Sequence, residues 1–552
     1  MPQTSQDLPR PREPLTPLLL SALREGYGAG RLRADAVAGM TVAIVALPLS
    51  MAIAIASGVG PERGLFTAIV GGFLVACFGG SRYQIGGPAG AFIVLVAACV
   101  AQTGIAGLVL ATFLSGAMLA VLGLARLGSY IRFMPYPVTV GFTTGIGVII
   151  FVSQVKDMFG LTLAGGEPGP ILPKLEALWA ARDSVTPMAV AVALATVVLI
   201  EAVKRFRPRW PSLLIGIAAV TAVSAGLGLP VETIASRFGE LPRMLPTPAL
   251  PDFSTQAIWA ALPWAVSFTL LGAIESLLSA MVADGMSGTQ HRSNMELVAQ
   301  GLANMGAALV GGFCVTGTIA RTATNVRAGA QTPVAGMLHA VFVLAVMLIA
   351  APLAGYIPLA ALAGLLAIVA WNMIERHEFA ALTRASKGDA LVLWVTFLMV
   401  VFRDLAEGIV LGFALGGLVF IRHMSEMTQL HEAPSGPHPD PQGEGAQQPR
   451  DVVTYRLRGA VFFGSVARLG TVLDRIAQRP RAVLLDMSEV SFIDSTGARM
   501  VQTLGQTLAR RGGELVIVGA RADLAQNLRA QGVQAPQVRF AEAVAPGAQG
   551  LS

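Results

Sequence analysis

A glycine-rich polar stretch, residues 311–336, interrupts a series of long apolar runs. It reads GGFCVTGTIARTATNVRAGAQTPVAG and contains Arg321 and Arg327. A helix that spans a membrane needs about 20 mostly apolar residues, and the part between Gly317 and Gly329 offers about half of that length. Polar, irregular backbone is tolerated at membrane depth only where protein buries it or where it lines a cavity. The stretch predicts the binding site of a transporter or, as the alternative, a loop with a purely structural role.

A second break of the same kind occurs in the first half of the chain. Residues 79–98 read GGSRYQIGGPAGAFIVLVAA, in which glycines and a proline precede a short apolar helix. The two halves of the chain resemble each other in a second feature. After each break an apolar run opens with a similar tripeptide, FMP at 133–135 and YIP at 356–358. Paired broken helices in corresponding positions are typical of transporters built from inverted repeats.

The composition places most of the chain in a membrane. Hydrophobic residues make up 54% of it and charged residues 13%, against roughly 25% charged residues in soluble domains. Seven apolar segments are predicted in each half of the chain. Because seven is odd, the second half crosses the membrane in the orientation opposite to the first, and the chain ends on the side where it began. The predicted apolar segments are 37–58, 64–79, 88–102, 106–126, 136–157, 185–204 and 212–228, then 257–283, 293–313, 318–328, 333–352, 358–374, 389–403 and 405–423.

The flanks of these segments indicate the topology. Residues 1–35 are rich in proline and arginine and carry no signal-peptide core, and basic flanks stay in the cytoplasm. The net charge of +6 fits loop topology better than nucleic-acid binding. The three cysteines, at 77, 99 and 314, are too dispersed to suggest a disulfide framework or a metal site. We therefore expect a multi-pass protein of the plasma membrane with a cytoplasmic N-terminus.

The composition changes after the last apolar segment. Residues 425–450 are expected to form a linker, because most of this range is polar and rich in proline. Beyond it, short strand patterns alternate with helical ones, which predicts a soluble α/β domain over 451–545. Strands are expected on either side of Gly459 and at 482–486 and 514–519, and helices at 467–478, 498–511 and 522–531.

Four sequence motifs together resemble the sulfate permease (SulP) family of anion transporters. They are ALPLSMAIAIASGVGPERGLF at 46–66, GGPAGA at 86–91, VTGTIARTATNVRAGAQTP at 315–333 and MSEVSFIDSTGA at 487–498, the last of which looks like a STAS domain. The resemblance implies an α-helical membrane domain over 36–424 with 14 segments in a 7+7 inverted repeat. It also implies a core domain of segments 1–4 and 8–11, a gate domain of segments 5–7 and 12–14, a cytoplasmic STAS domain and a homodimer.

The resemblance further implies that a small anion binds between the facing ends of segments 3 and 10. Helix N-termini expose unpaired backbone N–H groups and carry about half a positive charge, so two facing ends can hold an anion without a fixed cation. The alternative is that these small residues only allow close helix packing. The predicted site residues are Pro88, Ala89, Gly90 and Ala91 on one side and Gly317, Thr318, Ile319, Ala320 and Arg321 on the other.

Two charged residues are expected at membrane depth. Arg321 either adds positive potential behind the anion or neutralises Glu275. A carboxylate at the bilayer centre costs about 2.5–3.5 kcal/mol, which favours a functional role. The resemblance places Glu275 at the acidic coupling position of segment 8, and glutamate there predicts coupling to a proton. Ser276 and Ser279 leave a sodium site open, and a structural ion pair is the other alternative.

Two further motifs bear on substrate and regulation. Many relatives have a proline–glutamine pair in segment 1, whereas Pro48 is followed here by Leu49, which puts the identity of the substrate in doubt. In free-standing STAS proteins a hydroxyl in the DSTG motif is phosphorylated, and Ser495 or Thr496 would be its counterpart. The alternative is that Asp494 and Ser495 only cap the following helix.

These observations predict a secondary active transporter. The expected substrate is a small anion: a C4-dicarboxylate such as fumarate, sulfate, or bicarbonate, moved with a proton. Sodium-coupled bicarbonate symport and anion exchange remain alternatives, as do a nucleobase permease and a membrane-anchored STAS regulator. The sequence shows no nucleophile–base arrangement and no nucleotide-binding loop. We expect no enzyme activity, cofactor, metal or nucleic-acid partner; the expected partners are the anion, the coupling ion, the lipid bilayer and a second copy of the chain.

Overall fold

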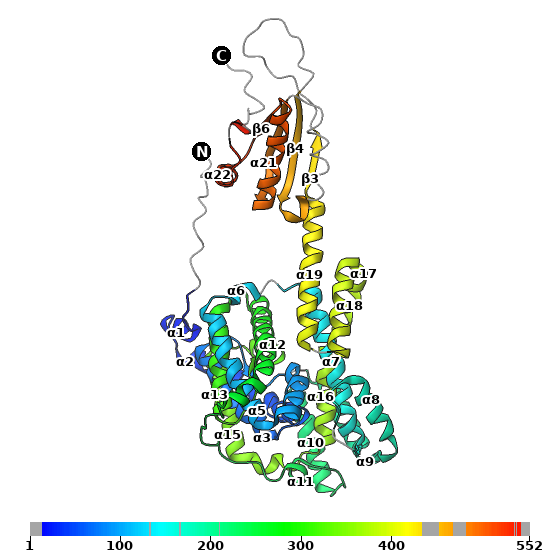
Figure 1. Cartoon of the computed structure of the whole chain (residues 1–552). Helices are drawn as coiled ribbons and strands as arrows, with labels where there is room; N and C mark the ends of the chain where they lie inside the picture. Colours follow the sequence, from blue (N-terminus) through cyan, green and yellow to red (C-terminus); the bar gives the residue numbers. More distant parts are fainter. Residues whose placement is uncertain are drawn as a thin grey trace. The chain divides into compact units, whose positions relative to one another are not determined.

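The computed structural model describes residues 14–131, 134–164, 167–208, 210–403, 405–432, 452–466, 482–534, 536 and 538–541. The chain forms two compact units, Met1–Phe413 and Ala414–Ser552. The first unit is helical, and the second contains the end of the last long helix and a five-stranded sheet (Figure 1).

Helices α1 to α11 form the first half of the helical unit, and the last of them, α11, lies within the proline-rich stretch 230–254. The fourth predicted segment continues directly from the third, and only a kink at Gly104, with φ of 69°, separates them. The elements are α1 (Leu18–Arg24), α2 (Ala29–Ala56), α3 (Pro61–Phe66), the π-turn Thr67–Gly71, α4 (Gly72–Phe78), the 3-10 turn η2 (Gly90–Phe92), α5 (Ile93–Leu124), α6 (Gly128–Ile131), α7 (Tyr136–Phe159), α8 (Ile171–Ala180), α9 (Pro187–Phe206), α10 (Ser212–Gly226) and α11 (Ile234–Phe238).

The second half also consists mostly of long helices. The short helix α14, of nine residues, follows the break at 311–318. The elements are α12 (Thr255–Ser287), α13 (Ser293–Leu309), α14 (Ile319–Arg327), α15 (Val334–Ala354), α16 (Leu359–Met373), α17 (Arg376–Ala385), α18 (Lys387–Phe402) and α19 (Leu405–Met427).

The duplicated FMP and YIP motifs end in two prolines with the same role. Pro135 and Pro358 are extended residues that precede α7 and α16, with φ of −62° and −65°. A proline suits this position because it lacks the N–H that a helix start leaves unpaired. Each predicted apolar segment coincides with helix, and within the described residues nine helical stretches are long and apolar enough to cross a membrane. The count of 14 spans and the inverted repeat stay predictions.

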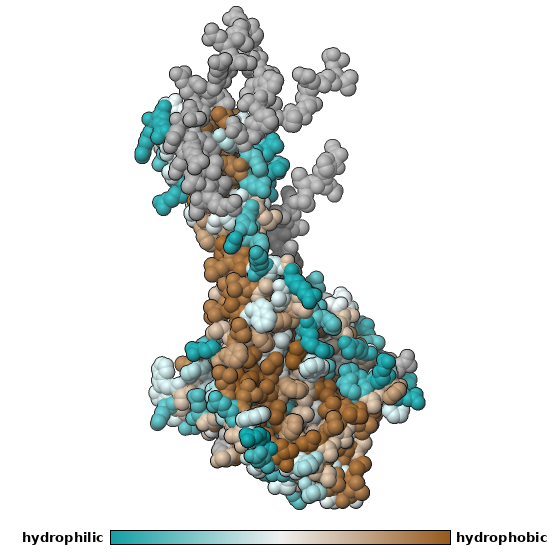
Figure 2. Space-filling view, turned by 90° about the vertical axis from the view of Figure 1, so that its right-hand side faces the viewer, coloured by the Kyte–Doolittle hydropathy of each residue, from teal (hydrophilic) through white to brown (hydrophobic). Residues whose placement is uncertain are grey.

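The long helices pack in two groups (Figure 1). Helices α2, α4 and α5 pack with α12, α13, α14 and α15, and α7 packs with α16 and α18, while α9 packs with α10 and α16. The division into a core domain and a gate domain, and the movement of one against the other, stay predictions. Apolar side chains cover much of the helical unit's surface in Figure 2, as lipid contact requires.

The two glycine-rich breaks meet inside the first group. Strands β1 (Gly86–Gly87) and β2 (Thr316–Gly317) pair antiparallel, with Gly86 opposite Gly317 and Gly87 opposite Thr316. All four residues are buried. Pairing satisfies backbone groups that would be costly to leave unpaired at membrane depth. The ladder also fixes where the helices that follow the two strands begin.

The second unit contains a mixed sheet with strand order β3-β4-β5-β6-β7. Strand β3 is antiparallel to β4, and the remaining neighbours are parallel. Its apolar core includes Val483, Leu485, Leu515 and Ile517. The elements are β3 (Gln429–Glu432), β4 (Val452–Val461), β5 (Ala482–Ile493), α21 (Ser495–Arg510), β6 (Glu514–Val518), α22 (Ala522–Ala530) and β7 (Val538–Ala541).

The structure differs from the sequence prediction at the start of this unit. A linker was expected from residue 425, whereas α19 continues to Met427 and β3 follows at once; residues 433–450 lie outside the described residues. The two strands expected around Gly459 are one strand, because Gly459, at φ of 90°, accommodates a register shift without ending the pairing. The helix expected at 467–478 also lies outside the described residues.

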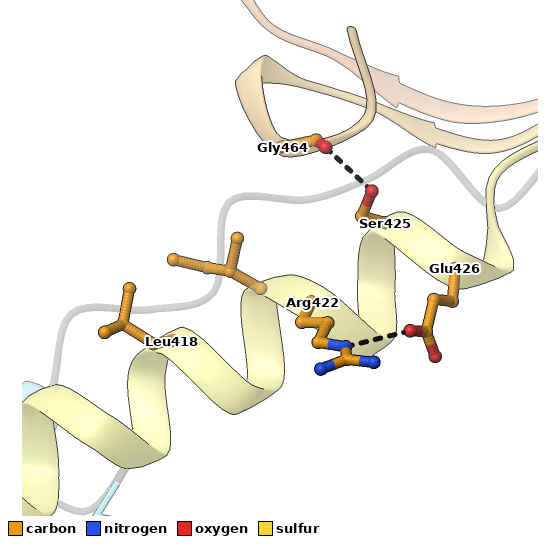
Figure 3. Close-up of a pocket in the computed structure, with 6 residues that line it drawn as sticks. Leu418, Arg422, Ser425, Glu426 and Gly464 are labelled. Atoms are coloured by element: carbon orange, nitrogen blue, oxygen red, sulfur yellow. Dashed lines mark hydrogen bonds and ion pairs between the residues drawn. The ribbon is translucent and has the colours of Figure 1, made fainter. Parts of the chain in front are cut away.

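A shallow pocket in the second unit lies between the end of α19 and Gly464, which follows β4 (Figure 3). The Ser425 hydroxyl donates to the carbonyl oxygen of Gly464 at 2.7 Å, and Arg422 pairs with Glu426 at 3.0 Å. The Thr428 hydroxyl donates to the Ala460 carbonyl at 2.7 Å. These bonds join the C-terminal end of α19 to the sheet that follows it.

Candidate functional site: a cavity between the two helix groups

A cavity of about 350 Å³ lies between the two helix groups. Eight of the nine residues predicted to bind substrate line it, together with Glu275. Gly317 does not, because it pairs with Gly86 in the two-stranded ladder. The eight are Pro88, Ala89, Gly90, Ala91, Thr318, Ile319, Ala320 and Arg321, and the rest of the wall is Val45, Leu49, Ile53, Ile93, Thr143, Ile146, Ile150, Leu213, Thr324, Leu366, Ile368, Val369, Asn372, Met373 and Glu375.

One wall of the cavity is the start of the helix that follows β1. The 3-10 turn η2 begins at Gly90, two residues after the proline where the sequence placed the helix start, and α5 continues from Ile93. The first helical bond runs from the Phe92 N–H to the Ala89 carbonyl, so the N–H groups of Gly90 and Ala91 have no helical acceptor. A Cβ on Gly90 would lie 3.3 Å from Ile150 of α7, so the opposite helix group closes tightly over this point.

The facing wall is the start of α14. Its first helical bond runs from Thr322 N–H to Thr318 carbonyl, which leaves the N–H groups of Ile319, Ala320 and Arg321 without a helical acceptor. The Ala320 side chain is exposed in the cavity.

Two amides that the sequence assigned to the anion are used within the protein instead. The Thr318 N–H donates to the Ile85 carbonyl at 3.0 Å. The Gly317 N–H donates to the Ser276 hydroxyl at 3.3 Å. The N–H groups free at this helix start therefore lie one to two residues later than expected.

Arg321 reaches the cavity from inside the first helix group. Only 1% of its surface is exposed. Its Nη2 donates to the Ser50 hydroxyl at 3.2 Å, while Nε and Nη1 have no hydrogen-bond partner among the described residues. A Cβ on Gly87 would lie 2.4 Å from Nη1. Any larger residue at this position would therefore clash with the guanidinium, which lies against strand β1. A buried guanidinium with unused donors is suited to an anion, since such donors are costly to leave unpaired.

Glu275 lines the same cavity without an ion-pair partner. It is 7% exposed, and no ion pair or hydrogen bond joins its side chain to any described residue. The predicted alternative, an ion pair between Arg321 and Glu275, is therefore not present among the described residues. An unpaired carboxylate with access to a cavity can exchange a proton with water there.

The second predicted coupling residue lies elsewhere. Ser279 is fully buried, does not line the cavity, and donates to the Thr322 hydroxyl at 3.1 Å. The Ser276 hydroxyl is 2.7 Å from that of Thr316. Ser276 therefore holds the break at 311–318 to α12, and Ser279 holds α14 to α12, so of the residues considered for coupling only Glu275 is at the cavity.

A polar stripe on α13 holds both breaks in place. The buried Glu296 accepts a hydrogen bond from the Gly80 N–H at 2.9 Å, before β1. Asn304 pairs with Val315, before β2, through both its amide donor and its acceptor, at 2.8 and 2.9 Å. Gln300 lies between them on the same face and donates to Glu296 at 2.8 Å. One helix therefore sets the positions of the two segments that precede the helix starts at the cavity.

The sequence interpretation missed this stripe and one further buried carboxylate. Asp35 is fully buried and accepts hydrogen bonds from the Gln331 and Thr332 N–H groups at 2.7 and 3.1 Å, which fastens the loop after α14 to α2. The signal for the stripe was present, because residues four apart share a helix face and Glu296, Gln300 and Asn304 have that spacing. Asp35 offered no such pattern.

The STAS hydroxyls lie at the first residues of α21. Asp494 caps this helix, accepting from the Gly497 N–H at 2.7 Å, as the structural alternative predicted. The Ser495 and Thr496 side chains are exposed. An exposed hydroxyl is accessible to a kinase, and modification of either residue stays a prediction.

Comparison with known proteins identifies the chain's relatives. Residues 32–396 match the sulfate permease family and residues 445–544 match the STAS domain. The chain is 38% identical to "Putative sulfate transporter YvdB" of Bacillus subtilis over 92% of this chain and 95% of that protein. It is 30% identical to "Bicarbonate transporter BicA" of Synechocystis over 90% of each.

Solved structures share the fold. The transmembrane domain of a cyanobacterial bicarbonate transporter, BicA, superposes with a TM-score of 0.64 at 33% identity, over 69% of this chain and 98% of that one. Murine Slc26a9, an anion transporter in the inward-facing state, superposes with a TM-score of 0.82 at 21% identity, over 94% of this chain and 90% of that one. The chain therefore belongs to the sulfate permease family of anion transporters and is a multi-pass membrane protein with a C-terminal STAS domain.

Proposed function

We propose that the chain is a secondary active transporter that binds a small oxyanion in the central cavity and moves it together with a proton. One observation carries the proposal: two helix starts meet at one cavity of about 350 Å³, and Arg321, whose Nε and Nη1 have no hydrogen-bond partner among the described residues, lines the same cavity. Helix N-termini and a buried cation both favour negative charge. Apolar residues such as Leu49, Ile53 and Ile146 form much of the remaining wall, so the two helix starts and Arg321 are the groups that recognise the charge of the ligand.

The substrate is best sought among bicarbonate, sulfate and C4-dicarboxylates such as fumarate. Relatives named as bicarbonate and sulfate transporters cover nine tenths of the chain, which supports the first two. Leu49 lines the cavity where many family members have a side-chain donor, so substrate selection here rests on backbone N–H groups and Arg321. Such a site selects a ligand by its negative charge and small size more than by its detailed shape.

Coupling to a proton rests on Glu275. A proton on this carboxyl offsets charge beside a bound anion, so that the loaded core domain crosses the gate domain with less buried charge. Sodium coupling is the weaker proposal, because Ser279 bonds to Thr322 away from the cavity.

Uptake into proteoliposomes tests the proposal. Labelled bicarbonate, sulfate and fumarate are each offered with an inward proton gradient, with an inward sodium gradient and with neither, and labelled uracil serves as the control substrate. We expect accumulation of at least one anion with the proton gradient alone. Accumulation of uracil and of no anion would contradict the anion site, and accumulation that requires sodium would contradict proton coupling.

A further inference from the structure

A second cavity, of about 740 Å³, runs along the outside of the second helix group. Residues of α7, α9 and α16 form it, together with Arg376 at the start of α17. Exposed apolar side chains along it fit a surface that faces lipid. Phe151 and Leu194 line it and are 37% and 60% exposed. The lining residues of α9 extend from Val190 to Lys204, which at 1.5 Å per residue is about 20 Å of helix. One leaflet of hydrocarbon is about 15 Å thick, so the groove has the length of an acyl chain.

The two ends of this groove differ in polarity. Apolar residues of α7 and α9 line one end, whereas Glu201, Lys204 and Arg376 line the other. Lys204 pairs with Glu201 at 3.2 Å. Arg376 has no carboxylate within ion-pair distance among the described residues, and its guanidinium stacks over Trp371 at 4.6 Å. One uncompensated positive charge therefore remains at the polar end.

The residues at the polar end of the groove fit the headgroup level of a membrane. Tryptophans concentrate at the membrane–water boundary, and Trp371 marks that level here. The chain leaves the apolar region at this point on both helices, since Arg205 and Arg207 follow Lys204, and α17 begins at Arg376. Clustered basic residues at helix ends mark the cytoplasmic face, where anionic lipids gather.

We propose that this groove binds one anionic phospholipid of the cytoplasmic leaflet, with its phosphate between Arg376 and Lys204 and an acyl chain along α9. Apolar length, one open end and a net positive charge at the headgroup level match this ligand. A zwitterionic phospholipid fills the same groove but leaves the charge of Arg376 uncompensated. The groove is distinct from the anion cavity in its lining and in the face on which it opens.

The bound lipid lies against the wall of the anion cavity. Ile368 and Asn372 of α16 line both spaces, so one helix separates lipid from substrate. Displacement of α16 during the transport cycle changes the width of the groove. The lipid therefore stabilises one position of α16, and the rate of transport depends on the anionic lipid content of the membrane.

Native mass spectrometry of the full-length protein tests this site. The protein is released from mixed micelles that contain equal amounts of phosphatidylglycerol and phosphatidylcholine with the same acyl chains. We expect retained phosphatidylglycerol to exceed phosphatidylcholine severalfold. Arg376→Gln, which removes the charge, and Leu194→Trp, which fills the groove, should each reduce that retention to the level of phosphatidylcholine.

Two matched variants are the controls. Arg384→Gln removes another arginine of α17, and Val198→Trp places the same bulk on another exposed position of α9; neither residue lines the groove. Both should retain phosphatidylglycerol as the wild type does. Equal retention of the two lipids by the wild type, or equal loss in variants and controls, would overturn the proposal. Loss of a dimer in Leu194→Trp without loss of lipid would overturn it as well, because the groove would then be an interface between copies. The readout is independent of which anion is transported.

Discussion

Two buried charged side chains, Arg321 and Glu275, give the cavity its chemistry. Neither is neutralised by the other: Arg321 donates to the Ser50 hydroxyl, whereas the Glu275 side chain has no hydrogen-bond or ion-pair partner in the described part of the chain. Keeping each charge at membrane depth is expensive, so their joint placement at one cavity favours a role in transport over a structural one. Each role can be tested with a substitution that removes the charge and keeps a polar side chain.

Glu275→Gln should retain anion binding but lose the stimulation of uptake by an acidic external medium. The amide resembles the protonated carboxyl and cannot release a proton. Exchange of internal for external anion should continue, because exchange needs no net proton movement. Uptake measured over a range of external pH, with and without sodium, gives the answer. A pH response that is unchanged in the variant would exclude Glu275 as the coupling group.

Arg321→Gln should weaken anion binding by about tenfold to a hundredfold. A hydrogen bond to a charged group contributes about 1.5–3 kcal/mol, and each 1.4 kcal/mol is a factor of ten. Arg327→Gln is the matched control, because Arg327 is the other arginine of α14 but is exposed and does not line the cavity. Isothermal titration with the transported anion compares them. Equal affinities of both variants would remove Arg321 from the site.

At the scale of elements, the site depends on two broken helices and on the helix that holds them. The ladder of β1 and β2 fixes the two breaks to each other, and α13 fixes both to the rest of the first helix group. Because the free N–H groups follow directly from where the two helices start, a shift of either break moves the anion site.

Asn304→Leu should lower both stability and transport. It leaves the N–H and the carbonyl of Val315 unpaired in a buried position, which costs about 1–3 kcal/mol for each group. Met305→Leu, a conservative change at the neighbouring position of α13, is the control. A thermal unfolding assay and uptake at a permissive temperature separate the effects. Full uptake by a folded Asn304→Leu protein would show that the break at 311–318 keeps its position without this residue.

The sequence predicted the elements of the site better than the contacts between them. Glycine and proline spacing located both breaks, and the family motif located Ala89, Ala320 and Glu275, all of which line the cavity. Spacing carries no information on which distant groups meet. The bond from Thr318 to Ile85 joins residues more than 200 positions apart, and it is why the free amides begin at Ile319.

At the scale of the whole molecule, the described residues that line the anion cavity all belong to the helical unit. The last of them is Glu375, well before the boundary at Phe413. The C-terminal unit has its own core, built from strands β4 to β7 and helices α21 and α22. Anion binding and the STAS fold are therefore expected to be separable.

Truncation after Met427, which keeps α19 whole, should leave anion affinity unchanged. Uptake rate and expression are expected to fall if the STAS domain supports dimerisation. Affinity is measured on truncated protein that elutes as a single species, beside the full-length chain. A well-folded truncation that no longer binds anion would show that the C-terminal unit contributes to the site.

The central claim is that the transported anion occupies the cavity between the starts of α5 and α14. Ala320→Leu tests it most directly, because the Ala320 side chain is exposed in the cavity and a larger one can extend there without repacking the helices. Ala101→Leu makes the same change at an exposed position of α5 that does not line the cavity. Initial uptake into proteoliposomes should fall to background for Ala320→Leu and stay at the wild-type rate for Ala101→Leu. Wild-type uptake by a folded Ala320→Leu protein would contradict the account.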